Sequence, residues 1–118
     1  MDAFTEAQAS FVVLPHVATD LGRLIASRQP LNLKQTKYLA WQTLLGLLHV
    51  HSAGVAHRDL KPGNILVTAS GAVSICDFGM SKSLEVGGDA TEYVVTRFYR
   101  APELLLGAGY GKQVDVRR

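Results

Sequence analysis

The 118-residue sequence has one cysteine, little excess charge and no long apolar run. The single thiol, Cys76, excludes an internal disulfide and is compatible with a reducing compartment. A formal net charge of +2 is too small to favour nucleic acid or a membrane surface as a partner. No apolar run approaches the ~20 residues of a membrane helix, and no basic region introduces a secretory signal. We therefore expect a soluble intracellular protein, in the cytoplasm, the nucleus or both.

Apolar residues make up 47% of the chain, which is enough for one small domain with a core. Two helices are predicted by the signals at their ends. Asp20 is a suitable N-cap for a short helix. Asn32 and Gln35 have the spacing of a capping box, which opens a longer helix that runs to about His51 and is followed by Gly54.

The longer helix carries an apolar stripe and two histidines. Four large side chains fall at helical spacing and define this stripe: Trp41, Leu44, Leu45 and Leu48. We interpret the stripe as part of the core. His49 and His51 are two positions apart and point to different faces, so we do not expect them to bind a metal together.

Short apolar stretches predict strands. Residues 11–14 (FVVL) suit a strand that Pro15 ends. Residues 65–68 and 73–76 predict a hairpin around a turn at 69–72. Strands of this kind beside the two helices predict the α+β class.

The last third of the chain is mostly polar. The stretch from Lys82 to Thr91 has no hydrophobic periodicity and predicts a mobile loop. A short helix is expected from Ala101 to about Gly107, and residues 107–113 (GAGYGKQ) read as a linker-like loop.

Residues 57–64 (HRDLKPGN) gather a carboxylate, a cation and an amide oxygen in one short loop, and a second carboxylate follows at Asp77. Hard oxygen ligands and a base beside a hydroxyl are what a magnesium–phosphate site requires. A chance polar loop in an unrelated α+β protein is the alternative. The agreement of the loop with the downstream Asp77-Phe78-Gly79 argues against it.

The loop at 57–64 resembles the catalytic loop of protein kinases, and Asp77-Phe78-Gly79 is similar to their magnesium-binding D-F-G motif. The resemblance implies an α+β, protein kinase-like fold. Residues 1–118 would form a partial kinase domain that covers the hinge, the mostly helical upper part of the C-terminal lobe and the activation segment. ATP and Mg²⁺ are the implied cofactors, and ATP and protein substrates the implied partners.

The same resemblance implies a role for each polar residue of the loop. Asp59 would orient the substrate hydroxyl and accept its proton, and Lys61 would steady the transferred phosphate. Asn64 and Asp77 would hold magnesium. Thr96 looks like the hydroxyl that lies between Asp59 and Lys61 beside the substrate. Phosphoryl transfer depends mostly on positioning and charge neutralisation, which these groups can supply.

Thr91-Glu92-Tyr93, followed by T-R-F-Y-R-A-P-E at residues 96–103, resembles the activation segment of mitogen-activated protein (MAP) kinases, in the CMGC group. The resemblance implies phosphorylation of Thr91 and Tyr93 by an upstream dual-specificity kinase, which orders the segment. It also implies a substrate serine or threonine that is followed by proline.

Each phosphate adds about −1.5 to −2 charges and requires cationic partners. Four residues are expected to supply them: Arg58 and Lys82 for Thr91, and Arg97 and Arg100 for Tyr93. Lys82 stands where the family usually has arginine. A lysine lacks the bidentate geometry of a guanidinium, so we expect weaker capture of phosphate there.

The stretch FVVLPHVATDL resembles the hinge strand of MAP kinases and the T-D-L after it. By this similarity Leu14 is the gatekeeper, and the carbonyl of Pro15 binds the adenine amino group. Val17 supplies a backbone N–H and C=O, Asp20 reaches the ribose, and Leu66 forms the floor of the adenine pocket.

The departures from the family pattern matter for activity. The sequence has no glycine-rich G-x-G-x-x-G loop and no V-A-I-K lysine; its first lysine is Lys34. Near the end, Val114-Asp115-Val116 resembles the start of the helix whose aspartate bonds to the catalytic-loop backbone. That helix does not continue, so we expect the stripe to face water and Glu103 to lack its usual arginine.

Two interpretations remain open. The first is a MAP kinase-type protein serine/threonine kinase, present as a partial catalytic domain. The second is a catalytically inactive kinase fragment that acts only as a binding or competitor module. The absent phosphate-gripping lysine favours the second for this chain in isolation.

Overall fold

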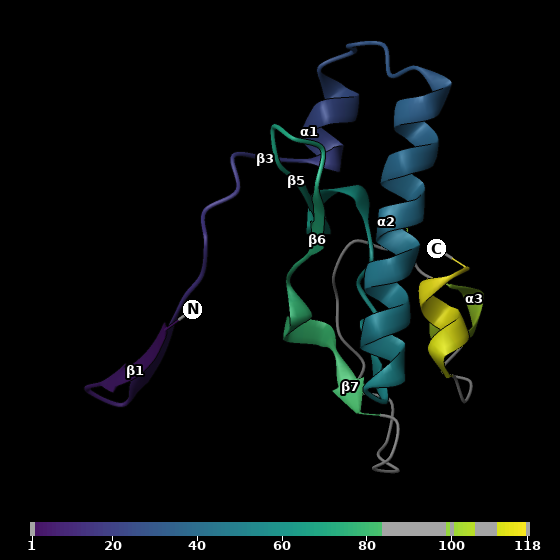
Figure 1. Cartoon of the computed structure of the whole chain (residues 1–118). Helices are drawn as coiled ribbons and strands as arrows, with labels where there is room; N and C mark the ends of the chain where they lie inside the picture. Colours follow the sequence, from purple (N-terminus) through teal and green to yellow (C-terminus); the bar gives the residue numbers. More distant parts are fainter. Residues whose placement is uncertain (1, 84–98, 100, 106–110, 118) are drawn as a thin grey trace.

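The computed structural model describes residues 2–83, 99, 101–105 and 111–117. One long helix runs beside several short strands, and an N-terminal hairpin extends away from both (Figure 1). The described elements, in chain order, are β1 (Asp2–Glu6), β2 (Ala9–Val13), β3 (Thr19–Asp20), α1 (Leu21–Ala26), α2 (Leu33–Ser52), β4 (Val55–Ala56), the 3₁₀ turn η1 (Pro62–Asn64), β5 (Ile65–Val67), β6 (Val73–Ile75), the 3₁₀ turn η2 (Phe78–Met80), β7 (Lys82–Ser83), α3 (Pro102–Leu105) and the 3₁₀ turn η4 (Lys112–Asp115).

The N-terminal hairpin pairs β1 with β2 in antiparallel register, with Phe4 opposite Phe11. The two rings stack with centroids 5.1 Å apart. The strand predicted at residues 11–14 is confirmed up to Val13, whereas β1 was not predicted. The turn between β1 and β2 is formed by Ala7 and Gln8, which have φ values of 45° and 70°. Tight hairpin turns with positive φ usually contain glycine or asparagine, so the sequence did not indicate this hairpin.

The two predicted helices are confirmed, and their caps explain where they begin. Asp20 Oδ1 accepts a hydrogen bond from Arg23 N at 2.8 Å at the start of α1. At the start of α2, the Asn32 side chain accepts from the backbone of Gln35 while the Gln35 side chain accepts from the backbone of Asn32. The helix ends at Ser52, and Gly54 follows shortly after it with a φ of 72°, a conformation that glycine adopts without a Cβ clash.

Beside α2 lies a three-stranded antiparallel sheet in the order β3-β5-β6. The hairpin of β5 and β6 confirms the strands predicted at residues 65–68 and 73–76. Helix α2 approaches β6 closely because Gly46 has no side chain: a Cβ there would lie 3.2 Å from Ile75 Cδ1. Gln42 ties the helix to the turn by donating to the Gly71 carbonyl at 2.7 Å. The two-residue strand β3 was not predicted.

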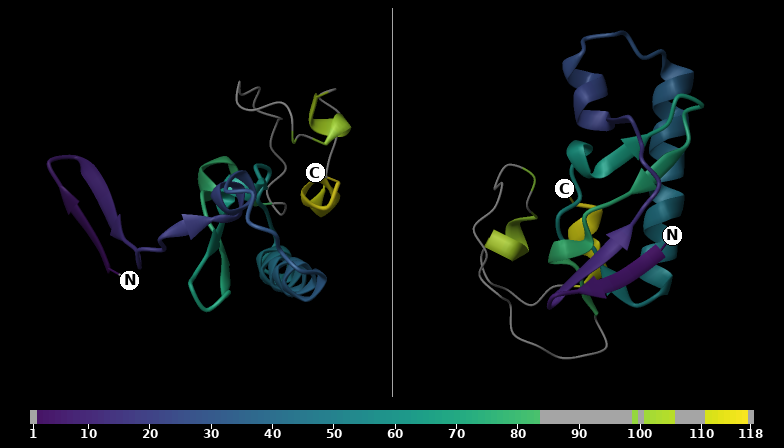
Figure 2. Two further views of the ribbon diagram at one scale, coloured as in Figure 1. Left: turned by 90° about the horizontal axis from the view of Figure 1, so that it is seen from above. Right: turned by 90° about the vertical axis from the view of Figure 1, so that its left-hand side faces the viewer.

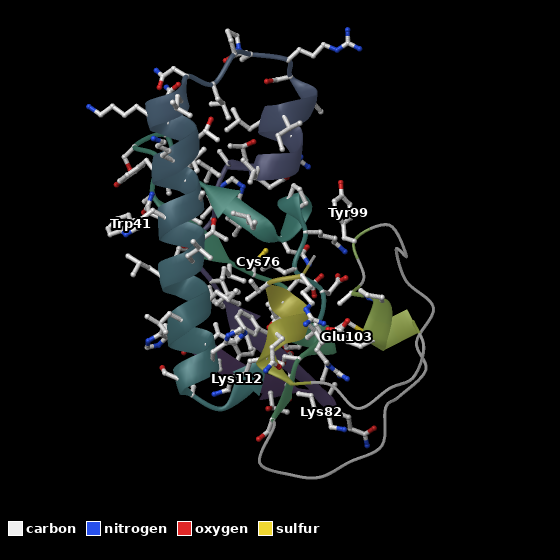
Figure 3. All side chains as sticks on the ribbon, turned by 90° about the vertical axis from the view of Figure 1, so that its right-hand side faces the viewer. Trp41, Cys76, Lys82, Tyr99, Glu103 and Lys112 are labelled. Carbon is white, nitrogen blue, oxygen red and sulfur yellow. The ribbon has the colours of Figure 1, made fainter. Side chains whose placement is uncertain are left out.

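The interpretation of the stripe as core is wrong for the described chain. Trp41 and Leu48 are 56% and 65% exposed, and Leu44 and Leu45 are also exposed. Helix α2 instead buries Leu39 and Leu47. The buried face lies one position round the helix from the stripe, on the side that packs against β6. The expectation that the stripe would face water is confirmed, and Trp41 projects outward from α2 in Figure 3.

Two predicted loops contain regular structure at their ends. The loop predicted from Lys82 begins later, because Lys82 and Ser83 form β7 and pair with β4. Residues 84–91 of that prediction lie outside the described residues. The loop predicted at 107–113 overlaps η4 at Lys112 and Gln113, and residues 107–110 of that prediction lie outside the described residues. The short helix predicted from Ala101 is confirmed as α3, although its expected end near Gly107 also lies outside the described residues.

Segments η4 and α3 lie on the far side of the molecule from the hairpin (Figure 2). Within the described residues, no helix combines the length and apolar character needed to cross a bilayer. The described structure supports the α+β class, and its buried side chains gather where α2, the sheet and η4 meet.

Candidate active site

Asp59 is the centre of the candidate site. Its side chain is almost fully buried, and its Oδ2 accepts a hydrogen bond from Lys61 Nζ at 2.7 Å. Asn64 Nδ2 donates to the same oxygen at 3.2 Å and to the Asp59 carbonyl at 2.8 Å. The turn η1 reverses the chain and returns Asn64 to Asp59. The structure therefore brings together three of the residues that the sequence singled out.

His57 connects this loop to the strand before Asp77. Its ring is fully buried, and Nε2 lies 2.9 Å from the Cys76 carbonyl. Nδ1 accepts from Asp59 N at 3.2 Å. A carbonyl can only accept, so these two bonds place the ring proton on Nε2. The ring of Phe78 meets His57 edge-on with centroids 4.8 Å apart, which packs the D-F-G sequence against the loop.

Asp115 anchors the loop backbone from η4. The residue is 2% exposed, and its carboxylate accepts from His57 N at 2.9 Å and from Arg58 N at 2.8 Å. The bond between Asp115 and the loop backbone that the resemblance implied is thus confirmed. Arg58 adopts φ 65°, an unfavourable conformation for a residue with a Cβ. We attribute its persistence to the Asp115 bond and to a bond from Arg58 Nε to the Met80 carbonyl at 2.6 Å.

Asn64 and Asp77 offer the kind of oxygen ligands that a magnesium ion prefers. The side-chain nitrogen of Asn64 donates to Asp59, so the side-chain oxygen Oδ1 is the atom of Asn64 that could bind an ion. Asp77 is exposed, with φ 64°. The described residues contain no cluster of three or more acidic, histidine or cysteine side chains that could hold a metal. Two protein oxygens leave most of an octahedral shell open, so the donor set fits an ion that arrives with nucleotide phosphates.

Of the residues predicted to bind the nucleotide, the structure places Asp20 and Leu66 next to each other. The pairing of β3 with β5 sets Asp20 opposite Leu66. Leu14 and Pro15 are exposed, and Val17 is half-buried. One Asp20 oxygen already caps α1, so a ribose contact would have to share that carboxylate. The nucleotide-binding roles of these five residues remain predictions.

Of the predicted phosphate receptors, Arg58 and Lys82 lie in the described structure. The β4–β7 ladder sets Lys82 opposite Ala56, two positions before Arg58, so both cations belong to one region. The other two receptors, the two predicted phosphorylation sites and the predicted catalytic threonine lie outside the described part of the chain: Arg97, Arg100, Thr91, Tyr93 and Thr96. Their roles remain predictions.

Cys76 lies beside the site, in the centre of Figure 3. Burial, then the negative charges of Asp77 and Asp20, raise the pKa of its thiol, and Lys61 opposes this effect. Its Sγ lies 3.5 Å from the backbone carbonyl oxygen of Asn64. The thiol therefore stays protonated at neutral pH.

Sequence reasoning missed two contacts around η4. His51 Nε2 lies 2.8 Å from Asp115 Oδ2, although the partners are 64 positions apart. Arg117 lies 3.5 Å from Glu103 and gives it an arginine partner within the chain; the expected loss of the family's usual arginine stays a prediction. No local pattern predicts either contact, because each joins residues far apart in the chain.

Comparisons with known proteins agree with this geometry. The family model for the protein kinase domain matches residues 1–116. Mitogen-activated protein kinase 4 of Oryza sativa subsp. japonica is 50% identical over 108 residues, which cover 90% of this chain and 29% of the relative. Mitogen-activated protein kinase 2 of Arabidopsis thaliana is 48% identical with the same coverage.

A solved structure, the yeast RNA Pol II CTD kinase CTDK-1 complex, contains a chain that matches with a TM-score of 0.83 and 34% identity. The match covers 99% of this chain and 40% of that one. The 118 residues span about three-tenths of the length of the MAP kinases they match. The family model, the relatives and the architecture agree, and the chain belongs to the protein kinase domain family.

Proposed function

We propose that this chain is the catalytic-loop portion of a MAP kinase-type protein serine/threonine kinase. Such an enzyme transfers the γ-phosphate of ATP to a serine or threonine followed by proline. The observation that carries the proposal is the cluster of Asp59, Lys61 and Asn64, in which Asp59 and Asn64 are buried, next to loop amides that bond to Asp115. The cluster occurs in a chain about half identical to MAP kinases.

Each residue of the cluster has a step to perform. The Asp59 carboxylate, oriented by Lys61 and Asn64, would align the substrate hydroxyl and accept its proton. The Lys61 ammonium would neutralise charge on the transferred phosphate. Asn64 and Asp77 would hold Mg²⁺, which supplies neutralisation of the nucleotide phosphates when bound.

We expect the 118 residues alone to show no phosphotransfer. The sequence contains no glycine-rich phosphate loop, and its first lysine is Lys34, inside α2. Positioning of the α- and β-phosphates is therefore incomplete. A chimera in which this chain replaces the matching segment of the rice MAP kinase would supply those groups.

The test measures transfer of radiolabel from magnesium-ATP to a Ser-Pro peptide. We expect no signal from the chain alone and activity from the chimera. Asp59→Ala in the chimera should lower kcat by about 10²–10⁴-fold. A folded chimera without activity would overturn the proposed function. Activity of the chain alone that depends on Asp59 would show that the glycine-rich loop and its lysine are dispensable for transfer.

The activation switch belongs to the same proposal. An upstream dual-specificity kinase would phosphorylate Thr91 and Tyr93, and the four predicted cations would receive the phosphates. Charge-assisted hydrogen bonds contribute ~1.5–3 kcal/mol each before the cost of ordering, enough to shift an order–disorder equilibrium strongly. Thr91→Ala with Tyr93→Phe should abolish activation of the chimera, and Lys82→Arg should raise activity of the doubly phosphorylated form. Unchanged activation in the double variant would refute the switch.

A second candidate is a non-catalytic module that competes for the upstream kinase inside the cell. The exposed stripe on α2 and the absent phosphate-gripping lysine favour it for the chain in isolation. The test adds the chain to an upstream kinase and its normal substrate. Inhibition that disappears with Thr91→Ala and Tyr93→Phe would support competition, and no inhibition would exclude it.

A further inference from the structure

The exposed stripe on α2 continues towards the start of the helix as two lysines. Seven residues make about two helical turns, so Lys34 lies in one row with Trp41 and Leu48. Lys37 lies in a neighbouring row with Leu44. Both lysines are exposed, like the stripe itself. We call these six side chains the Lys–Leu face: Lys34, Lys37, Trp41, Leu44, Leu45 and Leu48.

The charge around this face has one sign. The whole chain has 12 lysines and arginines and 10 aspartates and glutamates. Residues 21–58 hold five of those cations and none of the acids. Within the described residues, neither lysine of the face takes part in an ion pair. Lys34 also stands in the first turn of α2, where the helix dipole favours a carboxylate, so helix stability does not account for it.

We propose that the Lys–Leu face binds a partner protein through an amphipathic helix whose apolar stripe is flanked by carboxylates. Rows of side chains that repeat every seven residues suit the packing of one helix against another. The partner's apolar side chains would cover Trp41, Leu45 and Leu48, and its carboxylates would pair with the lysines. An exposed tryptophan on a helix is a suitable anchor, because tryptophan contributes strongly to protein interfaces. No residue of the face belongs to the candidate active site, so the proposal does not rest on the proposed function.

Charge argues against the other occupants of such a face. Helix α2 contains no carboxylate, so a second copy packed through the same face would leave the lysines of both copies without counter-ions. An anionic membrane attracts helices that carry lysine or arginine along their whole polar face, and α2 has neither after Lys37. A helix with an apolar stripe and carboxylates complements both parts of the face at once.

The single tryptophan of the chain, Trp41, lies on the face and projects outward from α2, so its fluorescence reports on the face directly (Figure 3). The first probe is a synthetic helical peptide of about three heptads, with leucine at positions a and d, glutamate beside them and no tryptophan. A second peptide has lysine in place of each glutamate. Vesicles of phosphatidylserine and phosphatidylcholine are the third probe. Each probe is titrated into the whole chain, and the blue shift of the Trp41 emission is measured.

We expect the acidic peptide to shift the emission and to saturate, and the basic peptide and the vesicles to bind at least ~10-fold more weakly. Lys34→Gln with Lys37→Gln should weaken binding of the acidic peptide by about 3–10-fold, the effect of losing two exposed ion pairs. Gln8→Glu with Ser10→Glu is the matched control, because it changes the net charge equally on the hairpin, which extends away from α2 (Figure 1). The control should change the affinity by less than about twofold.

The apolar part of the face is tested separately. Leu45→Ala with Leu48→Ala removes apolar contact and keeps Trp41 as the reporter. This variant should weaken binding of the acidic peptide at least ~30-fold. Ile25→Ala, which truncates a similarly exposed side chain on α1, is the control and should leave the affinity unchanged.

Several results would overturn the proposal. No shift with the acidic peptide, equal affinity for the two peptides, or equal losses in the lysine and hairpin variants would show that the face does not select a partner by charge. A larger shift with the vesicles than with the acidic peptide would assign the face to a membrane. A chain that stays self-associated in excess acidic peptide, measured by size-exclusion chromatography, would assign it to a second copy.

The kinase chimera repeats the test and decides the matter if the chain alone does not fold. The readout there is the fluorescence polarisation of a labelled acidic peptide. Binding should persist with the same charge preference. Its loss would show that the rest of the kinase domain covers the face and would overturn the proposal. A chimera that binds the peptide but transfers no phosphate would contradict only the proposed function.

Discussion

The catalytic loop and the N-terminal hairpin are short stretches of the same chain that are held in opposite ways. His57, Asp59 and Asn64 of the loop are buried, and their bonds reach Cys76 and η4. Every residue of β1 and β2 is exposed, and the hairpin relies on its own ladder and one ring stack. The loop gains its geometry from distant segments, whereas the hairpin owes its geometry to its neighbours in sequence. Perturbations of the two should therefore differ in size and in reach.

Asp115→Ala should have the largest effect, since it removes the common acceptor of the loop. The amides of His57 and Arg58 and the ring of His51 would lose their partner in a buried place. Each buried donor that is left without an acceptor costs about 1–3 kcal/mol, so the total is a large part of the ~5–15 kcal/mol that stabilises a typical domain. Urea denaturation measures the change. Asp115→Asn keeps one acceptor oxygen and should cost less, and an unchanged midpoint for the Ala variant would contradict the role of the anchor.

The second comparison sets Leu47 against Leu48, adjacent leucines on α2 that are 4% and 65% exposed. Leu47→Ala should destabilise by about 2–5 kcal/mol because it leaves a cavity. Leu48→Ala should change stability by less than about 0.5 kcal/mol. Equal costs in urea denaturation would show that the stripe is buried in solution.

The exposed stripe also predicts self-association. A contiguous apolar face in water favours aggregation, so we expect the isolated chain to be polydisperse or dependent on chaperones. Replacing Leu44 and Leu48 by glutamate should shift it towards monomer in size-exclusion chromatography without lowering the urea midpoint. A monodisperse monomer with a cooperative thermal transition before any substitution would contradict this expectation.

How far the sequence predicted the structure follows the same division between local and distant contacts. The caps at Asp20, Asn32 and Gly54 and the hairpin of β5 and β6 were predictable, because each depends on residues a few positions apart. The cluster around Asp59 was also predictable, since its partners lie within five positions. The face of α2 that is buried was not predictable, because it depends on where β6 packs against the helix.

Long-range pairings were visible only where a family pattern indicated them. Asp115 was identified through the resemblance of its surroundings to a kinase helix. The bond of His51 to Asp115, the pairing of β4 with β7 and the ion pair of Glu103 had no such signal. Two-residue strands also carry too little periodicity to be recognised.

Phe4→Ala tests the hairpin and should have a smaller and strictly local effect. The stacked pair with Phe11 is worth about 0.5–1.5 kcal/mol, and an isolated two-stranded hairpin is only marginally stable. Amide exchange across β2 should accelerate, while the urea midpoint of the rest of the chain stays unchanged. Phe11→Ala should behave in the same way. A shift of the main transition would show that the hairpin is coupled to the core.

The smallest effect concerns Cys76, which lies between the buried loop and solvent. Burial and the charges of Asp77 and Asp20 raise its pKa in the folded chain. In the unfolded chain the thiol ionises near its usual pKa of about 8.5. Above that pH the unfolded state loses the proton while the folded state retains it, so stability should fall as pH rises. Below it, both states are protonated and the thiol contributes no slope.

Urea midpoints measured at intervals across that range should therefore decline for the unsubstituted chain. They should decline less for Cys76→Ala, and the difference between the two isolates the thiol from lysine and tyrosine titration. Alkylation by iodoacetamide gives an independent measure, because the thiolate is the nucleophile. Cys76 should react more slowly in the folded chain than in urea at the same pH. Faster reaction in the folded chain would mean that the Lys61 ammonium lowers the pKa of Cys76 by more than burial and the two carboxylates raise it.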